Sequence, residues 1–124
     1  MCGFVGFTSK INSKETVLER MMERIIHRGP DMGGQYVTDD IAMGFRRLSI
    51  LDLSEAGAQP MQSEDGRVIV TFNGEIYNFM ELRAQLQAAG HTFATDHSDT
   101  EVLLHGYEEW GEGKIGRASC RERV

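Results

Sequence analysis

The sequence has little of what marks several large classes of protein. Its two cysteines, Cys2 and Cys120, lie near opposite ends, so they offer neither a disulfide framework nor metal-ligand spacing. No apolar run reaches membrane-spanning length, and the first residues lack the charged region and cleavage site of a secretory signal. Lysine and arginine form no basic patch, which argues against nucleic acid as a partner. We therefore expect a reducing, cytoplasmic setting without a membrane partner.

Two phosphate-binding motifs are also missing from the chain. It has neither a GxxxxGK[ST] loop nor a Ser-Gly-Gly-x-Asp-Ser type pyrophosphate loop, so we expect no ATP site in this chain. We also expect no other cofactor and no metal ion in it. What is present is typical of a soluble protein. The 124 residues are 40% hydrophobic and 26% charged, with a net charge of −6. This length permits one domain with a substantial core.

The hydrophobic pattern predicts a mixed α and β fold with an antiparallel sheet. The predicted strands are 3–7 (buried), 35–38 and 41–48 (a hairpin around Asp39-Asp40), 67–72 and 91–95. The predicted helices run from about 13 to 27, from 78 to 90 and from 98 to 111. Each helix begins at a capping box, which pairs Asn12 with Glu15, Asn78 with Glu81, and Ser98 with Glu101. Gly90 and Gly111 are expected to end the second and third helices, and 52–60 is expected to be a loop.

The last eleven residues, 114–124, depart from this organisation. They read KIGRASCRERV and show neither periodicity nor an apolar face. We interpret them as a foreign tail derived from a sequencing adapter, so that the domain covers 1–113, Cys120 has no biological role and the natural chain continues past about Gly113. The alternative is a genuine polar tail, which is commonly disordered.

The position of Cys2 is the strongest indication in the sequence of a catalytic nucleophile. If Met1 is removed, a thiol and a free α-amine lie on the same residue. The ordinary pKa of an α-amine is about 7.7–8.0 and that of a thiol about 8.5, so the amine can accept the thiol proton and leave a nucleophilic thiolate. The alternative is that Cys2 is a small apolar residue at the start of a strand.

Six short motifs occur in a fixed order along the chain. They are Met1-Cys2-Gly3, His27-Arg28-Gly29-Pro30-Asp31, Arg47-Leu48-Ser49-Ile50, Gly57-Ala58-Gln59-Pro60-Met61, Asn73-Gly74-Glu75-Ile76-Tyr77-Asn78 and Ser98-Asp99-Thr100-Glu101. Together they closely resemble the N-terminal glutaminase domain of glutamine-hydrolysing asparagine synthetases, a class II glutamine amidotransferase domain. The resemblance covers essentially 1–113. It implies an α+β fold of the N-terminal-nucleophile hydrolase type, an αββα sandwich of antiparallel sheets of which only the N-terminal part is present.

The resemblance implies catalytic roles for three residues. Cys2 attacks the side-chain amide of glutamine, while the Asn73 side-chain amide and the Gly74 backbone N–H form the oxyanion hole. The alternative for Asn73-Gly74 is a plain hairpin turn, because Asn-Gly is the commonest hairpin signal. His27 is expected to be structural at a helix end, since the α-amine already supplies the base.

The resemblance also implies a binding site for the free amino acid. Arg47 matches the residue that binds the α-carboxylate of glutamine, and Glu75 and Asp99 match the contacts to its α-ammonium. The alternatives are ordinary ones. Arg47 can be a surface charge, Glu75 a solvated turn residue, and Asp99 a favourable negative charge in the first turn of a helix.

In the resembled family, the glutaminase domain works with a second domain. ATP, Mg²⁺ and aspartate bind a C-terminal synthetase domain, where ammonia from glutamine reacts with ATP-activated aspartate to give asparagine. We expect that domain, and roughly the second half of the glutaminase domain, to be missing here. We therefore expect the chain by itself to be inactive or prone to aggregation, because missing strands leave open sheet edges. Three alternatives stay open: an asparagine-synthetase-like tailoring enzyme, a sugar-phosphate aminotransferase of the same glutaminase class, or a non-catalytic α/β module in which Cys2 is structural.

Overall fold

A computed structural model of the chain describes residues 2–48 and 57–116. These residues belong to two compact units. The first unit is Met1–Pro60 with Thr71–Asn73, and the second is Met61–Val70 with Gly74–Val124. Both combine helices with antiparallel strands, so the predicted α+β class is confirmed at this level.

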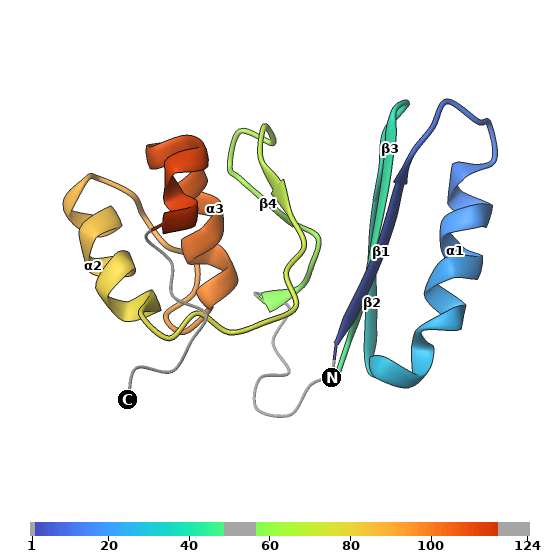
Figure 1. Ribbon diagram of the computed structural model, residues 1–124, viewed down its shortest axis with the longest axis horizontal. Helices are drawn as coiled ribbons and strands as arrows, with labels where there is room; N and C mark the ends of the chain where they lie inside the picture. Colours follow the sequence, from blue (N-terminus) through green and yellow to red (C-terminus); the bar gives the residue numbers. More distant parts are fainter. Residues whose placement is uncertain (1, 49–56, 117–124) are drawn as a thin grey trace. The chain divides into compact units, whose positions relative to one another are not determined.

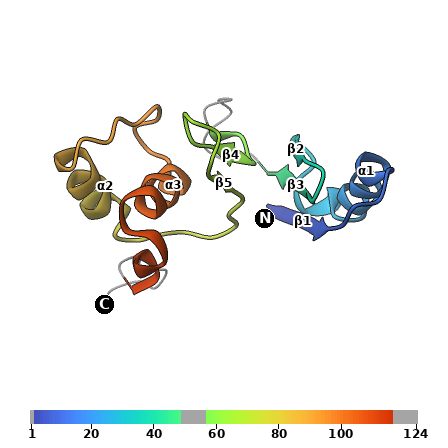
Figure 2. The same ribbon diagram turned by 90° about the horizontal axis from the view of Figure 1, so that it is seen from above.

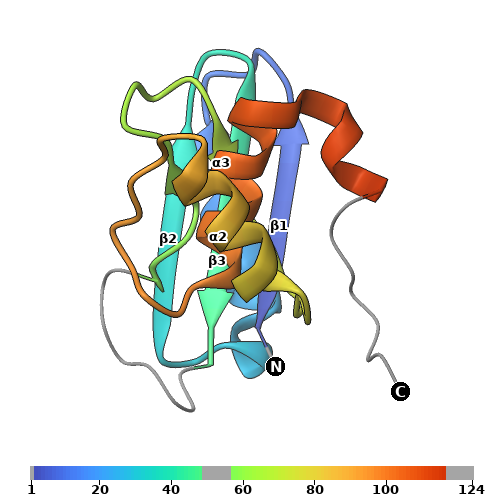
Figure 3. The same cartoon turned by 90° about the vertical axis from the view of Figure 1, so that its left-hand side faces the viewer.

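The first unit is a three-stranded antiparallel sheet with a helix along one face (Figure 1). Its strands are β1 (Gly3–Thr8), β2 (Met32–Val37) and β3 (Ile41–Arg47), and β3 lies between the other two (Figure 3). The helix is α1 (Lys14–Arg24). The buried core beneath it consists of Leu18, Met22 and Ala42, against which Val5, Phe7 and Val37 pack.

The predicted hairpin is confirmed, with strands slightly shifted from the predicted ranges. β2 and β3 pair antiparallel from Met32 opposite Arg47 to Val37 opposite Ala42. The Thr38 amide donates to the Ile41 carbonyl at 2.8 Å across the Asp39-Asp40 turn. β1 pairs with the other edge of β3, with Gly3 opposite Arg46. The start of β1 therefore lies beside the end of β3.

Two expectations for the first unit were wrong in detail. The strand predicted to be buried is only half-buried, because α1 covers the face that Val5 and Phe7 share, whereas Phe4 is 53% exposed. The first helix begins after Ser13, not after Asn12, and Ser13 makes no side-chain capping bond. The helix ends at Arg24, and a 3₁₀ turn (Ile26–Arg28) completes the predicted range.

The second unit pairs two helices and carries a small two-stranded sheet. The helices α2 (Phe79–Ala88) and α3 (Asp99–Trp110) lie side by side (Figure 2). The strands β4 (Met61–Gln62) and β5 (Ile69–Val70) pair antiparallel, and a 3₁₀ turn (Gly111–Gly116) follows α3. The buried apolar side chains of this unit are Ile76, Leu82, Leu86, Val102 and Leu104.

Local sequence signals placed both of these helices correctly. Gly90 and Gly111 have φ values of 99° and 56°, which glycine adopts with less strain than other residues, and they follow α2 and α3. Ser98 caps α3 by accepting the Glu101 amide at 3.4 Å. Asn78 is the residue before α2, as predicted, although its side chain makes no capping bond.

Two predicted strands in the second unit were wrong in length or kind. The strand predicted at 67–72 is reduced to Ile69–Val70, because its partner β4 has only two residues. The segment 91–95 is irregular. Its Ala94 and Thr95 amides donate to the Glu101 carboxylate at 2.5 and 2.8 Å instead of joining a strand ladder. That carboxylate therefore does not serve as the reciprocal half of the predicted capping box.

Parts of the predicted loop and tail lie outside the described residues. Of the expected loop, only 57–60 are described, and of the expected tail, only 114–116, which continue the 3₁₀ turn from Gly111. Cys120 lies outside them as well. Within the described residues, no helix combines the length and apolar character needed to cross a membrane.

Candidate active site

Cys2 lies where the start of β1 meets the end of β3. Its half-buried thiol faces the backbone of Leu48, with Sγ 3.5 Å from the Leu48 nitrogen and 3.8 Å from the Leu48 oxygen. The amide therefore donates to sulfur and the thiol donates to the carbonyl. These contacts follow from the β1–β3 register, because the pair Gly3–Arg46 brings the preceding residue Cys2 beside Arg47 and Leu48.

Two side chains hold the backbone carbonyl of Cys2. Arg28 donates from Nε at 3.1 Å, and Asn73 donates from Nδ2 at 2.9 Å. Arg28 comes from the 3₁₀ turn after α1, whereas Asn73 comes from the segment after β5. The predicted nucleophile and the predicted oxyanion donor are thus brought together. His27, the neighbour of Arg28, is exposed, and the contact to Cys2 comes from the arginine instead.

Gln59, for which the sequence predicted no role, fixes the segment that carries Asn73. The Gln59 side chain accepts the Phe72 amide at 2.6 Å and donates to the Phe72 carbonyl at 3.1 Å. It thereby satisfies both backbone groups of the residue before Asn73, as a strand partner would. The only sequence signal was its place in the Gly57–Met61 motif. The hairpin alternative for Asn73-Gly74 is wrong, because the chain continues from β5 to α2.

The segment around Gly29 packs closely against the end of β3. The Arg46 side chain donates from Nε to the Gly29 carbonyl at 2.9 Å, and the Asp31 amide donates to the Arg47 carbonyl at 3.1 Å. A Cβ atom at Gly29 would lie 2.3 Å from the Arg46 carbonyl carbon, which no real side chain tolerates. The close approach requires glycine, and it fixes the backbone on which Arg47 stands.

Arg47 is the last residue of β3 and is half-buried. Its guanidinium lies beside Gly57, where a Cβ atom would be 3.3 Å from Nη2. Because Leu48 contacts the Cys2 thiol, the residue predicted to bind the substrate carboxylate belongs to the same end of the sheet as Cys2 and Asn73.

The other predicted binding residues, Glu75 and Asp99, belong to the second unit together with Gly74. Asp99 lies in the first turn of α3, and its Oδ2 accepts the Ile76 amide at 3.0 Å. Burial raises the pKa of Asp99, and the negative charge of Glu75 raises it further, against the hydrogen bonds from the Ile76 and Thr100 amides. Glu75 itself is exposed. Two carboxylates that repel one another in this way favour a nearby cation.

These observations first define a class: an α+β protein with antiparallel sheets, whose second residue is a cysteine held by a side-chain amide. The model of the glutamine amidotransferase domain family matches residues 1–119, and the chain therefore belongs to this family. The resemblance drawn from the six motifs is confirmed.

Individual relatives carry the same name in several organisms. The chain is 48% identical over 117 residues to asparagine synthetase [glutamine-hydrolyzing] 1 of Bacillus subtilis (strain 168), covering 90% of this chain and 18% of that protein. It is 44% identical over 120 residues to asparagine synthetase [glutamine-hydrolyzing] 2 of the same strain, covering 93% and 16%. The asparagine synthetase [glutamine-hydrolyzing] of Zea mays is 41% identical over 115 residues, covering 90% and 19%. The chain thus spans about a fifth of the length of these curated relatives.

Proposed function

We propose that this chain is the glutamine-hydrolysing part of an asparagine synthetase, with Cys2 as the nucleophile. The observation that carries the proposal is the contact of Asn73 Nδ2 with the Cys2 carbonyl at 2.9 Å, at the end of β3 that bears Arg47. It joins the predicted nucleophile to a predicted donor in a chain of the amidotransferase family.

Before any turnover, hydrolysis of the Met1–Cys2 peptide bond removes Met1 once and converts the Cys2 nitrogen from a peptide amide to an amine. This amine takes the thiol proton, and sulfur attacks the side-chain carbonyl carbon of glutamine. The tetrahedral intermediate collapses by breaking the carbon–nitrogen bond, and the protonated amine gives its proton to the departing ammonia. Water then hydrolyses the thioester, which releases glutamate and restores the thiol.

Asn73 and Gly74 supply the oxyanion hole in this proposal. A side-chain amide nitrogen has two N–H groups, and the bond to the Cys2 carbonyl uses one of them. The second N–H of Asn73 and the backbone N–H of Gly74 stabilise the oxyanion. Loss of one such donor typically costs about 3–4 kcal/mol of transition-state stabilisation.

The two ends of free glutamine distinguish it from a simple amide. The Arg47 guanidinium binds the α-carboxylate, where two parallel hydrogen bonds are geometrically matched. Glu75 and Asp99 bind the α-ammonium. Its positive charge favours the ionised form of Asp99, whose pKa burial and Glu75 hold above the usual range. Ammonium binding and Asp99 ionisation are therefore coupled.

The remaining parts of the proposal concern the complete protein. In the complete protein, the glutaminase domain forms a full αββα sandwich. Ammonia then passes to a C-terminal synthetase domain that uses ATP, Mg²⁺ and aspartate. Residues 1–113 form the N-terminal part of the glutaminase domain, and 114–124 are a foreign tail. The chain by itself does not turn over glutamine.

A chimera tests this function. Residues 1–113 replace the matching segment of the Bacillus subtilis asparagine synthetase 1, to which the chain is 48% identical. We expect glutamine-dependent release of glutamate, loss of Met1, and labelling of Cys2 by an electrophilic glutamine analogue, all read by mass spectrometry and a glutamate assay. The matched control, Cys2→Ala, abolishes labelling and glutamate release.

Supplying free ammonia bypasses the glutaminase step and shows that the rest of the chimera is folded. The proposal fails if the chimera makes asparagine from free ammonia while it retains Met1 or leaves Cys2 unlabelled. It also fails if the Cys2→Ala chimera still hydrolyses glutamine.

A further inference from the structure

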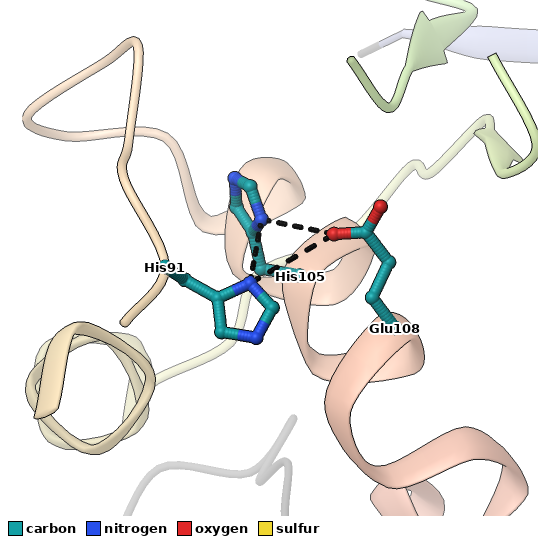
Figure 4. A group of neighbouring side chains, drawn as sticks. All are labelled: His91, His105 and Glu108. Carbon is teal, nitrogen blue, oxygen red and sulfur yellow. Dashed lines mark hydrogen bonds and ion pairs between the residues drawn. The ribbon is translucent and has the colours of Figure 1, made fainter. Parts of the chain in front are cut away.

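A second cluster of reactive side chains lies wholly within the second unit and has no role in glutamine hydrolysis. It consists of His91, which follows α2, and of His105 and Glu108, one turn apart on α3 (Figure 4). Both Nδ1 atoms and one Glu108 oxygen converge. The separations are 3.2 Å between the two Nδ1 atoms, 3.2 Å from His105 to Glu108 and 3.8 Å from His91 to Glu108.

We propose that His91, His105 and Glu108 bind a divalent transition-metal ion of the zinc class. Zinc bonds to imidazole nitrogen and carboxylate oxygen are about 2.0–2.2 Å long, and tetrahedral geometry then separates neighbouring ligand atoms by about 3.3–3.6 Å. The three separations here run from 3.2 to 3.8 Å around that range. The three ligand atoms are therefore already spaced like three of the four corners of a tetrahedral zinc site.

The other nitrogen of each imidazole faces a carboxylate. His91 Nε2 lies 2.9 Å from Glu109 Oε2, and His105 Nε2 lies 3.6 Å from Glu101 Oε1. At His91 the hydrogen-bonded carboxylate favours the proton on Nε2, which leaves the Nδ1 lone pair free to bind a metal. Histidine ligands of metal ions commonly have such a hydrogen-bond partner on their other nitrogen. The Glu109 carboxylate thus orients the His91 imidazole as a ligand, whereas Glu101 is only an ion-pair neighbour of His105 Nε2, and His105 Nδ1 faces Glu108 at 3.2 Å.

Charge and burial favour a cation at this point. Two Nδ1 lone pairs that face one another at 3.2 Å repel unless a proton or a metal ion lies between them. The carboxylates of Glu101, Glu108 and Glu109 surround the two imidazoles. The His105 side chain is 9% exposed, and the Glu108 side chain is 26% exposed, so water screens the cluster only in part.

The site also has room for a fourth ligand. His91, His105 and Glu108 line a cavity of about 260 Å³, whose other walls include Glu64 and Asp65. A water molecule in that cavity completes four-coordination. Imidazole nitrogen is a poor ligand for Mg²⁺ and Ca²⁺, which prefer oxygen, so the ligand set selects zinc-class ions. The bound ion would join the segment after α2 to α3.

The test uses the 124-residue chain in a Cys2→Ser, Cys120→Ser background, which removes thiolates as competing ligands. The metal-free monomer, isolated by size-exclusion chromatography, is titrated with Co²⁺ and with Zn²⁺. We expect the visible spectrum of four-coordinate Co²⁺ and a calorimetric Zn²⁺ stoichiometry of one.

Variants separate this site from other histidines and carboxylates. His91→Gln and Glu108→Gln each remove one ligand, and we expect them to weaken Zn²⁺ binding more than about 100-fold. Glu109→Gln removes the carboxylate that is hydrogen-bonded to His91 Nε2, and loss of such a partner typically weakens metal binding about 10–100-fold. His97→Gln and Glu112→Gln make the same chemical changes on exposed residues outside the cluster and should leave the affinity unchanged.

Thermal unfolding controls for variants that fold poorly. Added Zn²⁺ should raise the unfolding temperature of the parent, of His97→Gln and of Glu112→Gln, but not that of His91→Gln or Glu108→Gln. Absence of a four-coordinate Co²⁺ spectrum in the folded parent overturns the proposal. Equal Zn²⁺ affinity in the parent and in His91→Gln or Glu108→Gln overturns it as well. None of these readouts depends on glutamine hydrolysis.

Discussion

At the scale of single residues, the carbonyl oxygen of Cys2 is the point on which the candidate active site depends. Arg28 and Asn73 donate to the same oxygen at 3.1 and 2.9 Å. Removal of either side chain takes one hydrogen-bond donor from the carbonyl of the nucleophile. Only Asn73 is also proposed to stabilise the oxyanion, so the two residues form a matched pair for separating position from catalysis.

Asn73→Ala and Arg28→Gln should therefore differ in the chimera. We expect Asn73→Ala to lower kcat for glutamine hydrolysis by about 10²–10³, because it removes an oxyanion donor. Arg28→Gln removes one hydrogen bond from a charged donor, worth about 1.5–3 kcal/mol of positioning, but no oxyanion donor. Because only part of that loss falls on the transition state, it should lower kcat by about tenfold. Steady-state glutamate release measures both. Equal losses in the two variants would leave Asn73 with a positioning role only.

Asp99 gives a residue-level prediction about pH. Its pKa is raised by burial and by Glu75, so the folded state binds a proton more tightly than the unfolded state does. The stability that depends on this carboxyl is present at low pH and declines as pH rises from near its ordinary value of 3.8 through the raised folded value. Asp99→Asn removes this dependence.

We expect the free energy of unfolding of the parent, minus that of Asp99→Asn, to fall as pH rises across this window. Urea unfolding followed by the fluorescence of Trp110, the one tryptophan of the chain, reports on the second unit. Glutamine binding should nevertheless be weaker in Asp99→Asn. A difference that rises with pH would contradict the cause assigned to the shift.

At the scale of elements, the start of α3 is stabilised by its own side chains. Ser98 accepts the Glu101 amide, and the Glu101 carboxylate accepts the Ala94 and Thr95 amides. Burial opposes ionisation of Glu101, but the Thr95 hydroxyl and these two amides outweigh it and lower its pKa. The start of α1 differs, because Ser13 makes no side-chain capping bond.

The two serines allow a controlled test of capping. Ser98→Ala should reduce the free energy of unfolding by about 1 kcal/mol, the usual value for a lost side-chain cap. Ser13→Ala makes the same change at a helix start without such a bond. It should reduce the free energy of unfolding by only a few tenths of the value for Ser98→Ala. Urea unfolding followed by far-UV circular dichroism compares them. A larger loss in Ser13→Ala would show that this cap assignment is wrong.

At the scale of the whole molecule, the described strands leave sheet edges. The order β1-β3-β2 makes β1 and β2 the outer strands of the three-stranded sheet, and β1 carries Phe4 at 53% exposure. Outer strands with exposed apolar side chains are templates for pairing with another chain. We expect the isolated chain to self-associate through these edges, and this is the physical basis for expecting it to lack glutamine turnover.

A charge on the outer strand should therefore reduce association. We expect Phe4→Lys to increase the monomer fraction in size-exclusion chromatography with light scattering. Ile26→Lys places the same charge on an apolar residue of 47% exposure in the 3₁₀ turn, outside any strand, and should have little effect. If both variants act equally, general surface hydrophobicity and not strand pairing drives the association.

Elements with strong local signals were predictable, and those that needed a partner were not. Gly90, Gly111 and Ser98 marked the ends of α2 and α3 because positive φ and side-chain capping depend on neighbouring residues alone. The strand at 67–72 was overestimated because strand length depends on pairing, and β4 offers two residues. The proposed roles of Arg47, Glu75 and Asp99 came from the family resemblance and stay predictions.

The sequence by itself determined the family, the order of the helices and the presence of a cysteine in second place. Only the tertiary structure decided that Arg28 and Asn73 meet at the Cys2 carbonyl and that Gln59 pairs with Phe72. It also brought His91, which follows α2, against His105 and Glu108 of α3. The physical reason is that a hydrogen bond between residues far apart in the chain leaves no local periodicity. Such a bond is set by strand register and helix packing, which form only when the chain is folded.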